Sequence, residues 1–253
     1  MRHVVKVLAT ASVAAVFAVS LSACGGGGQT QQSDAGSTAV EKEPEVEEKP
    51  AVEEVKAEPN PYIKESTWRC DDNQIDGTKY VQADYVIGCG DPTNCYVMMK
   101  VQITAKSSDG TVLATDTDYV TFVAPNDIMP CSHVLTTAEE PAEVTFDLSY
   151  DQGQKPGNDY TLADLPVANQ TVSEVNGYTK WTGEYTNQTG VDFERGCDAY
   201  VVLRKDGKLV AIFNGHGTGD AANGSTHPFE ISSYSGSVPE HDSYEVYIVP
   251  NLI

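Results

Sequence analysis

Two stretches of the chain alternate apolar and polar residues with a period of two. In residues 97–105 the apolar side chains share one face: Val97, Met99, Val101, Ile103 and Ala105. In residues 144–150 the corresponding face carries Val144, Phe146, Leu148 and Tyr150. This alternation of apolar and polar residues, with many of them β-branched or aromatic, predicts half-buried strands of antiparallel sheet. Other apolar runs predict strands at 80–87, 111–122, 178–185, 199–204, 209–213 and 244–249.

Helical periodicity is weak by comparison. No helical repeat after the N-terminal segment extends beyond two turns, and TLADLP at residues 161–166 predicts a single helical turn. The pattern therefore predicts an all-β fold.

Two Asp-Gly turns, at residues 109–110 and 206–207, each separate two predicted strands. Asp-Gly between alternating runs is the strongest short-range signal for a hairpin. Similar segments precede the two turns (KYVQADYVIG and YTKWTGEYTN), follow them (PNDIMPCSHVL and NGSTHPFEIS) and close each copy (EVTFDLSY and YEVYIV). We therefore predict two β-sandwich modules, at residues 61–155 and 173–253, joined by a linker at 156–172. The alternative is that short strands with Asp-Gly turns look alike in any all-β chain.

The second copy reads TGEYTNQTG…DAYVVLRKDGKLVAIFN…THPFEISS…YEVYIVPN. It resembles the FxLYD-type and related immunoglobulin-like modules of bacterial surface lipoproteins, in which an Asp-Gly turn joins a long strand to its return strand. The resemblance covers roughly residues 75–253. It implies two tandem immunoglobulin-like antiparallel β-sandwiches.

The N-terminal residues 1–23 differ in composition from the rest. Arg2 and Lys6 precede an apolar run at 7–23, which predicts an export signal. A membrane-spanning helix is the alternative, but the run falls short of the roughly 20 residues that a span needs, and four glycines follow Cys24.

The end of this run resembles the lipobox of bacterial lipoproteins, whose four positions are matched by Leu21, Ser22, Ala23 and Cys24. The resemblance implies cleavage between Ala23 and Cys24 and attachment of a diacylglycerol to Cys24, so that acyl chains such as palmitate anchor the protein in the lipid bilayer. We expect the anchored protein on the extracytoplasmic face of the cell membrane. An ordinary signal peptide with a chance cysteine is the alternative.

Residues 24–60 predict a disordered tether that starts at the lipidated cysteine. Glycines open the segment, and glutamates and prolines fill the rest, without one aromatic residue. Such a composition buries too little apolar area to offset the chain entropy of folding. At about 3.1 Å per residue when extended, the tether reaches on the order of 100 Å.

The chain is strongly acidic, with 37 Asp and Glu against 16 Lys and Arg and a formal net charge of −21. This charge repels phosphate backbones and anionic lipid headgroups, so nucleic acid is excluded as an expected partner. The acidity keeps an exported protein soluble, and a cationic ligand is the alternative interpretation.

Five cysteines remain once Cys24 is assigned to the lipid anchor. In an exported chain they can oxidise, and four of them permit three full pairings. We favour Cys89 with Cys95, which bracket the turn sequence GDPTN, and then Cys70 with Cys131. Cys197 is left as a possible free thiol, without a neighbouring base in the sequence. Paired CxxC spacing is absent from the sequence, which argues against zinc.

Two further patterns raise the possibility of chemistry. His216, Asp220 and His227 share a glycine-rich segment, which suggests an alternative function as a hydrolase or, with Cys197, a redox accessory. DDNQIDG at 71–77 resembles part of a calcium loop, but its twelfth position is Ala83 in place of glutamate.

No sequence motif of a nucleotide-binding loop, metalloprotease or serine hydrolase occurs in a suitable setting. The sequence predicts no catalytic residue, metal or cofactor. We therefore expect a non-enzymatic protein that binds an unknown envelope protein or extracellular ligand, or assembles with one.

Overall fold

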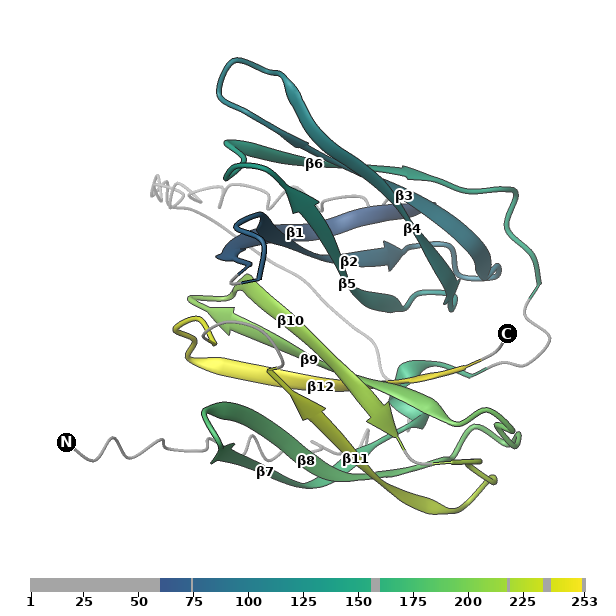
Figure 1. Ribbon diagram of the computed structural model, residues 1–253. Coiled ribbons are helices and arrows are strands. Elements are labelled where there is room, and N and C mark those ends of the chain that lie inside the picture. Colours follow the sequence, from purple (N-terminus) through teal and green to yellow (C-terminus); the bar gives the residue numbers. More distant parts are fainter. Residues whose placement is uncertain (1–59, 74, 156–159, 218, 234–237, 252–253) are drawn as a thin grey trace, which may run out of the picture. The chain divides into compact units, whose positions relative to one another are not determined.

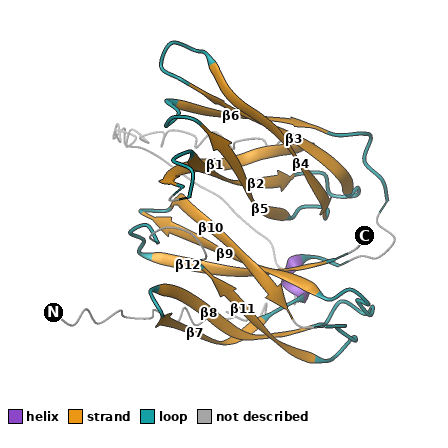
Figure 2. Ribbon diagram, in the orientation of Figure 1, coloured by secondary structure: helices purple, strands orange, loops and turns teal. Residues whose placement is uncertain are grey.

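The computed structural model describes residues 60–251, apart from residue 74 and the segments 156–159, 218 and 234–237. The predicted export signal, the lipobox with Cys24, and all of the predicted tether except Asn60 lie outside these residues. Within them the fold is all-β with antiparallel strands, as the alternation predicts (Figures 1 and 2). Among the described residues, no helix is long and apolar enough to span a membrane.

The first six strands are β1 (Pro61–Asp72), β2 (Lys79–Cys89), β3 (Tyr96–Lys106), β4 (Val112–Val123), β5 (Ile128–Thr137) and β6 (Glu143–Ser149). We call them the first module. They form two three-stranded sheets, ordered β1-β2-β5 and β4-β3-β6. Alternate residues of β2 and β3 meet between the sheets, where Val81, Tyr85, Met99 and Ile103 are fully buried. From Met99 to Ala105 the apolar face that the sequence predicts is thus the inner face of a sandwich, whereas Val97, before Met98 with its φ of +51°, is only half-buried.

The second module contains a short 3₁₀ turn, η1 (Leu162–Asp164), and the strands β7 (Val167–Val175), β8 (Tyr178–Thr186), β9 (Cys197–Lys205), β10 (Lys208–Gly217), β11 (Thr226–Ser232) and β12 (Ser243–Pro250). The turn lies where TLADLP predicts one. The strands follow the order β12-β9-β10-β11-β8-β7.

The second sheet bends at one corner. β10 and β11 pair only where Gly215, His216 and Gly217 meet residues 229–231, so the rest of β10 separates from β11. The sheet thereby forms two halves, β10-β9-β12 and β7-β8-β11, which Figure 1 shows as separate layers. A second core with Trp181, Tyr185 and Val201 lies on their inner faces.

The strand order of the first module recurs in the second. The sheet β1-β2-β5 corresponds to β7-β8-β11, and β4-β3-β6 corresponds to β10-β9-β12. Both Asp-Gly hairpins also carry a register shift at the same place, near the turn. In the first hairpin it lies between Ala105 and Lys106 of β3, and in the second between Leu209 and Ala211 of β10. The segments that suggest a repeat in the sequence therefore occupy equivalent strands.

A third apolar cluster joins the two modules. Val86 of β2 packs with Val202, Leu209 and Ile212 of the second module, and all four are buried. The outer face of β1-β2-β5 thus lies against the outer face of β10-β9-β12 (Figure 1).

Polar contacts surround this cluster. Arg204 of β9 donates two hydrogen bonds to the Glu65 carboxylate, at 2.7 and 2.6 Å. The fully buried Asp84 carboxylate accepts hydrogen bonds from Arg69, from the Ser132 hydroxyl and from the Ile212 backbone N–H, the last at 3.1 Å. The guanidinium of Arg69 also lies 4.6 Å from the centroid of the Phe213 ring.

The linker prediction at 156–172 is corrected in part. β7 begins at Val167, inside that range, and pairs with β8 as an edge strand of the second module. Nearly every residue of β7 is exposed, so it carries no apolar face that the alternation could reveal. The strands β1, β5 and β11 are likewise absent from the predicted set.

Candidate functional site

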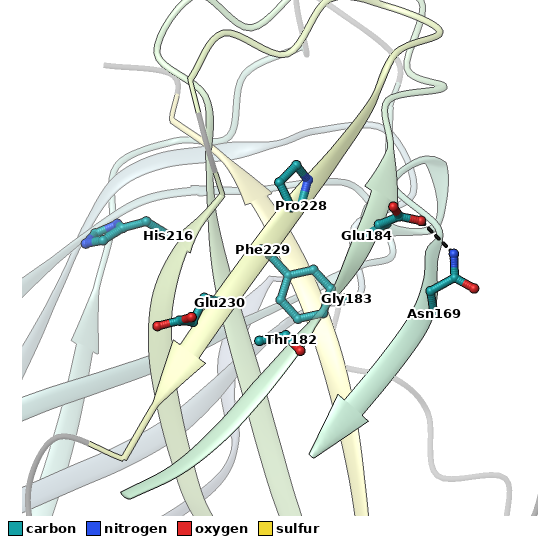
Figure 3. A pocket seen from close by; sticks show the side chains of 8 residues that line it. All are labelled: Asn169, Thr182, Gly183, Glu184, His216, Pro228, Phe229 and Glu230. Carbon is teal, nitrogen blue, oxygen red and sulfur yellow. Dashed lines mark hydrogen bonds between the residues drawn. The ribbon is translucent and has the colours of Figure 1, made fainter. Parts of the chain in front are cut away.

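An open groove of about 500 Å³ lies on the second module (Figure 3). Its lining comes from four strands: Asn169 of β7, Thr182, Gly183 and Glu184 of β8, His216 of β10, and Pro228, Phe229 and Glu230 of β11. The corner between β10 and β11 brings His216 opposite Glu230. The groove therefore depends on the bend that closes the second module.

Local backbone features shape the groove. The register between β7 and β8 shifts between Ala168 and Thr171, and Asn169 within this bulge has a φ of +52°. Asparagine tolerates this left-handed conformation better than most residues. Opposite the bulge, a Cβ on Gly183 would lie 2.7 Å from the ring of Phe229, so the glycine leaves room for that buried ring.

The polar side chains of the groove are held by neighbours. The Asn169 amide donates to the Glu184 carboxylate at 2.6 Å, shown by the dashed line in Figure 3. Lys180 donates to the Glu230 carboxylate at 2.6 Å, and His216 Nδ1 lies 3.1 Å from Asp198 Oδ1. Both carboxylates present hydrogen-bond acceptors on an open sheet face, and Glu184, whose partner is a neutral amide, adds a negative charge that no lysine balances, whereas Glu230 is paired with Lys180. Such a surface favours a partner with hydrogen-bond donors or positive charge.

The predicted cluster of His216, Asp220 and His227 is not assembled. His216 of β10 lies opposite Glu230 of β11. His227 of β11 lies opposite Tyr185 of β8 and packs on the tyrosine ring, with the two ring centroids 5.6 Å apart. Because Glu230 and His227 are three positions apart on one strand, the two histidines point to opposite faces of the sheet. Among the described residues, no group of three or more His, Cys, Asp or Glu side chains could hold a metal ion.

A serine–histidine contact occurs that the sequence reasoning missed. Ser225 Oγ lies 2.6 Å from His227 Nε2, and the same hydroxyl donates to the carbonyl of Ala222. The serine proton is thus directed at the carbonyl, and the imidazole acts as the donor to the serine. The contact closes a loop and does not activate a nucleophile.

Cys197 lies inside the second core, at the start of β9. Its side chain is buried, and burial raises the pKa of its thiol to about 11. Because the thiolate is the reactive form, this environment makes Cys197 a poor nucleophile at neutral pH.

The other four cysteines are also free thiols in the structure. Cys89 and Cys95 are buried at the ends of a turn in which the Asp91 carboxylate accepts hydrogen bonds from Thr93 and Asn94. These hydrogen bonds lower the pKa of Asp91. A disulfide between Cys89 and Cys95 stays a prediction.

The second predicted pair, Cys70 with Cys131, is incompatible with the strand register. Cys70 of β1 lies opposite Val81 of β2, and Cys131 of β5 lies opposite Tyr85 on the other side of β2. The two cysteines lie on strands either side of β2 and four positions apart along it, a separation on the order of 16 Å. A disulfide requires Cα atoms within about 7 Å.

Of the calcium-like segment 71–77, Asp71 and Asp72 end β1, and Asp76 lies in the turn before β2. The Asp76 carboxylate accepts hydrogen bonds from the backbone and hydroxyl of Thr78, which lower the pKa of Asp76. Residue 74, one of the predicted calcium-loop positions, lies outside the described residues. The hydrogen bonds around Asp76 are those of an aspartate turn.

No protein-family model matches the chain, and no curated protein matches it significantly. The class is therefore defined by the fold and the groove alone. The described residues form an antiparallel all-β protein of two packed modules, with an acidic groove on the outer face of β7-β8-β11.

Proposed function

We propose that the protein is a lipid-anchored lipoprotein of the bacterial cell envelope with a non-enzymatic binding or assembly role. Two observations support the proposal. The residues Leu21, Ser22, Ala23 and Cys24 match a lipobox at the end of an export-type segment. The groove, whose lining includes Asn169 and Glu184, provides an open surface on which a partner can dock.

We assign the binding role to the groove. An open sheet face suits a macromolecular partner better than a small ligand, because small-molecule sites are generally concave and bury most of the ligand. The tether would hold this face away from the membrane, where an envelope protein or extracellular ligand can reach it.

Anchoring is tested by replacing the predicted lipid-carrying residue. We expect Cys24→Ala to move the protein from the membrane fraction to the soluble fraction, because the acyl chains supply the membrane affinity. Globomycin, which blocks the lipoprotein signal peptidase, should leave the wild-type precursor uncleaved. Cys70→Ala serves as the control and should stay with the membrane. A Cys24→Ala protein that remains membrane-bound would contradict the anchoring.

Binding is tested by affinity capture from envelope extracts with the tagged chain 25–253. We expect partners retained by the wild type to be lost from Glu184→Lys, because the substitution reverses the charge of an exposed residue that lines the groove. Glu194→Lys makes the same change in an exposed loop outside the groove and should retain them. Equal retention by both variants would exclude the groove as the binding surface.

A further inference from the structure

Asparagine precedes glycine at three places in the second module, at residues 176–177, 214–215 and 223–224. In such a pair, the backbone nitrogen of the glycine can attack the side-chain amide carbon of the asparagine, because glycine has no side chain to obstruct the approach. The attack requires the peptide between the two residues to rotate, so the local hydrogen bonds decide whether it occurs in the folded protein.

The pair at 214–215 is held inside a sheet. Gly215 is buried and pairs with Ala199 of β9 on one side and with Ile231 of β11 on the other. Rotation of the peptide between Asn214 and Gly215 would break both pairings. The fold therefore protects this asparagine.

The other two pairs are alike in exposure and in space. Asn176 and Asn223 are both exposed, and so are the glycines that follow them. Gly177 has a φ of +82° and Gly224 a φ of +79°, and a Cβ added to either would meet no heavy atom within 4 Å. Only their hydrogen bonds distinguish the two pairs.

The pair at 223–224 is fixed by its neighbours. The Gly224 N–H, which belongs to the attacking nitrogen, donates to the backbone carbonyl of the buried Asn187 at 2.6 Å. Asn223 Oδ1 accepts the Gly190 N–H at 3.0 Å, and the Asn223 N–H donates to Asp192 Oδ1 at 2.7 Å. These bonds hold both the nitrogen and the amide that it would attack.

The pair at 176–177 forms the two-residue turn between β7 and β8. Val175 lies opposite Tyr178, and the φ values of Asn176 and Gly177 are +53° and +82°, as in a type I′ turn. Within the described part of the chain, no hydrogen bond is made by the Asn176 side chain or by the Gly177 N–H. The peptide between them can therefore rotate without breaking a bond of the ladder.

We propose that Asn176 is a site of spontaneous deamidation, with water as the co-reactant. The Gly177 nitrogen loses its proton to solvent base and attacks Asn176 Cγ. The new N–Cγ bond closes a cyclic imide, the Cγ–Nδ2 bond breaks, and ammonia leaves. Water then opens the imide at one of its two carbonyls and yields aspartate or isoaspartate, without oxidation or reduction.

The two products have different effects on the hairpin. Aspartate keeps the main chain and adds a negative charge, whereas isoaspartate inserts the side-chain methylene into the main chain and lengthens a turn that matches the strand twist. β7 is an edge strand with nearly every residue exposed, so it is held mainly by its ladder with β8 (Figure 1). Isoaspartate therefore loosens the strand that carries Asn169 of the groove. The inference goes beyond the proposed function and does not depend on it.

The test incubates the soluble chain 25–253, which contains every described residue, in mildly alkaline buffer with and without urea. Tandem mass spectrometry follows the mass increase of about 1 Da at each asparagine. In the folded chain, Asn176 should convert at least about tenfold faster than Asn214 and Asn223. In urea the three should convert at comparable rates, because the fold no longer distinguishes them. A folded chain in which Asn176 converts no faster than Asn223 would overturn the proposal.

Two variants complete the test. Asn176→Gln moves the amide one methylene farther from the backbone nitrogen, so it should stop the reaction at this turn and leave the rates at the other two pairs unchanged. Asn176→Asp reproduces the aspartate product. Hydrogen exchange of the β7 amides should be faster in the isoaspartate form than in Asn176→Asp, while β9 is unchanged. Equal exchange in the two forms would overturn the predicted loosening of β7.

Discussion

Replacing Asp84 by alanine is expected to lower the free energy of unfolding by about 3–5 kcal/mol. The carboxylate is fully buried between the modules, and the side chain of its partner Arg69 is only 16% exposed. Removing the carboxylate leaves the guanidinium without its counter-charge and the Ile212 N–H without its acceptor. The measurement is the midpoint of urea unfolding, with the slope checked for constancy.

Two controls distinguish the effect of breaking the ion pair from the general effect of removing an aspartate. Asp147→Ala removes an exposed carboxylate of β6 and should change stability by less than about 0.5 kcal/mol. The double variant Asp84→Leu with Arg69→Met removes both charges and should recover the part of the loss that comes from the unpaired guanidinium, while the Ile212 N–H still lacks its acceptor. A loss below about 1 kcal/mol for Asp84→Ala would contradict the account of the module contact.

The sequence predicts the strands that carry a two-residue alternation, and its failures have local physical causes. β7 has almost no buried residue, so it shows no alternation. β5 and β11 contain Pro130 and Pro228, which argue against a strand because proline cannot donate to the ladder. β5 is the edge strand of its sheet, and Pro228 lies just beyond the short pairing of β11 with β10, so neither strand needs the missing N–H on that side.

The site and the module contact could not be predicted from the pattern for a different reason. Alternation places Asp84 and Glu184 alike on the outer face of a strand, where a carboxylate is expected to meet water. Packing of one module on the other buries Asp84 and leaves Glu184 exposed. The difference arises from contacts between segments more than 100 residues apart, such as Asp84 with Ile212 at a separation of 128. The proposed histidine cluster fails similarly, because the strand register decides which face each histidine occupies.

Gly215→Ala is expected to have the second large effect, because it acts on the corner that forms the groove. An added Cβ would lie 2.1 Å from the carbonyl oxygen of Glu230 and 2.8 Å from the Cα of Ile231, and both are backbone atoms. Neither can move aside without separating β10 from β11, which pair only at this point. We expect a loss of about 3 kcal/mol in the free energy of unfolding, measured by urea unfolding.

The matched control is Gly207→Ala in the hairpin turn between β9 and β10. Gly207 has a φ of +74° but no heavy atom within 4 Å of an added Cβ. Alanine there should therefore lower the free energy of unfolding only through backbone strain, by about 1–2 kcal/mol. The comparison isolates the close approach at the corner from the general cost of replacing a glycine. Because the corner sets His216 beside Glu230, Gly215→Ala should also lose whatever the groove binds, while Gly207→Ala should retain it. Equal stability of the two variants would mean that β10 and β11 separate at little cost, and that the groove does not depend on their pairing.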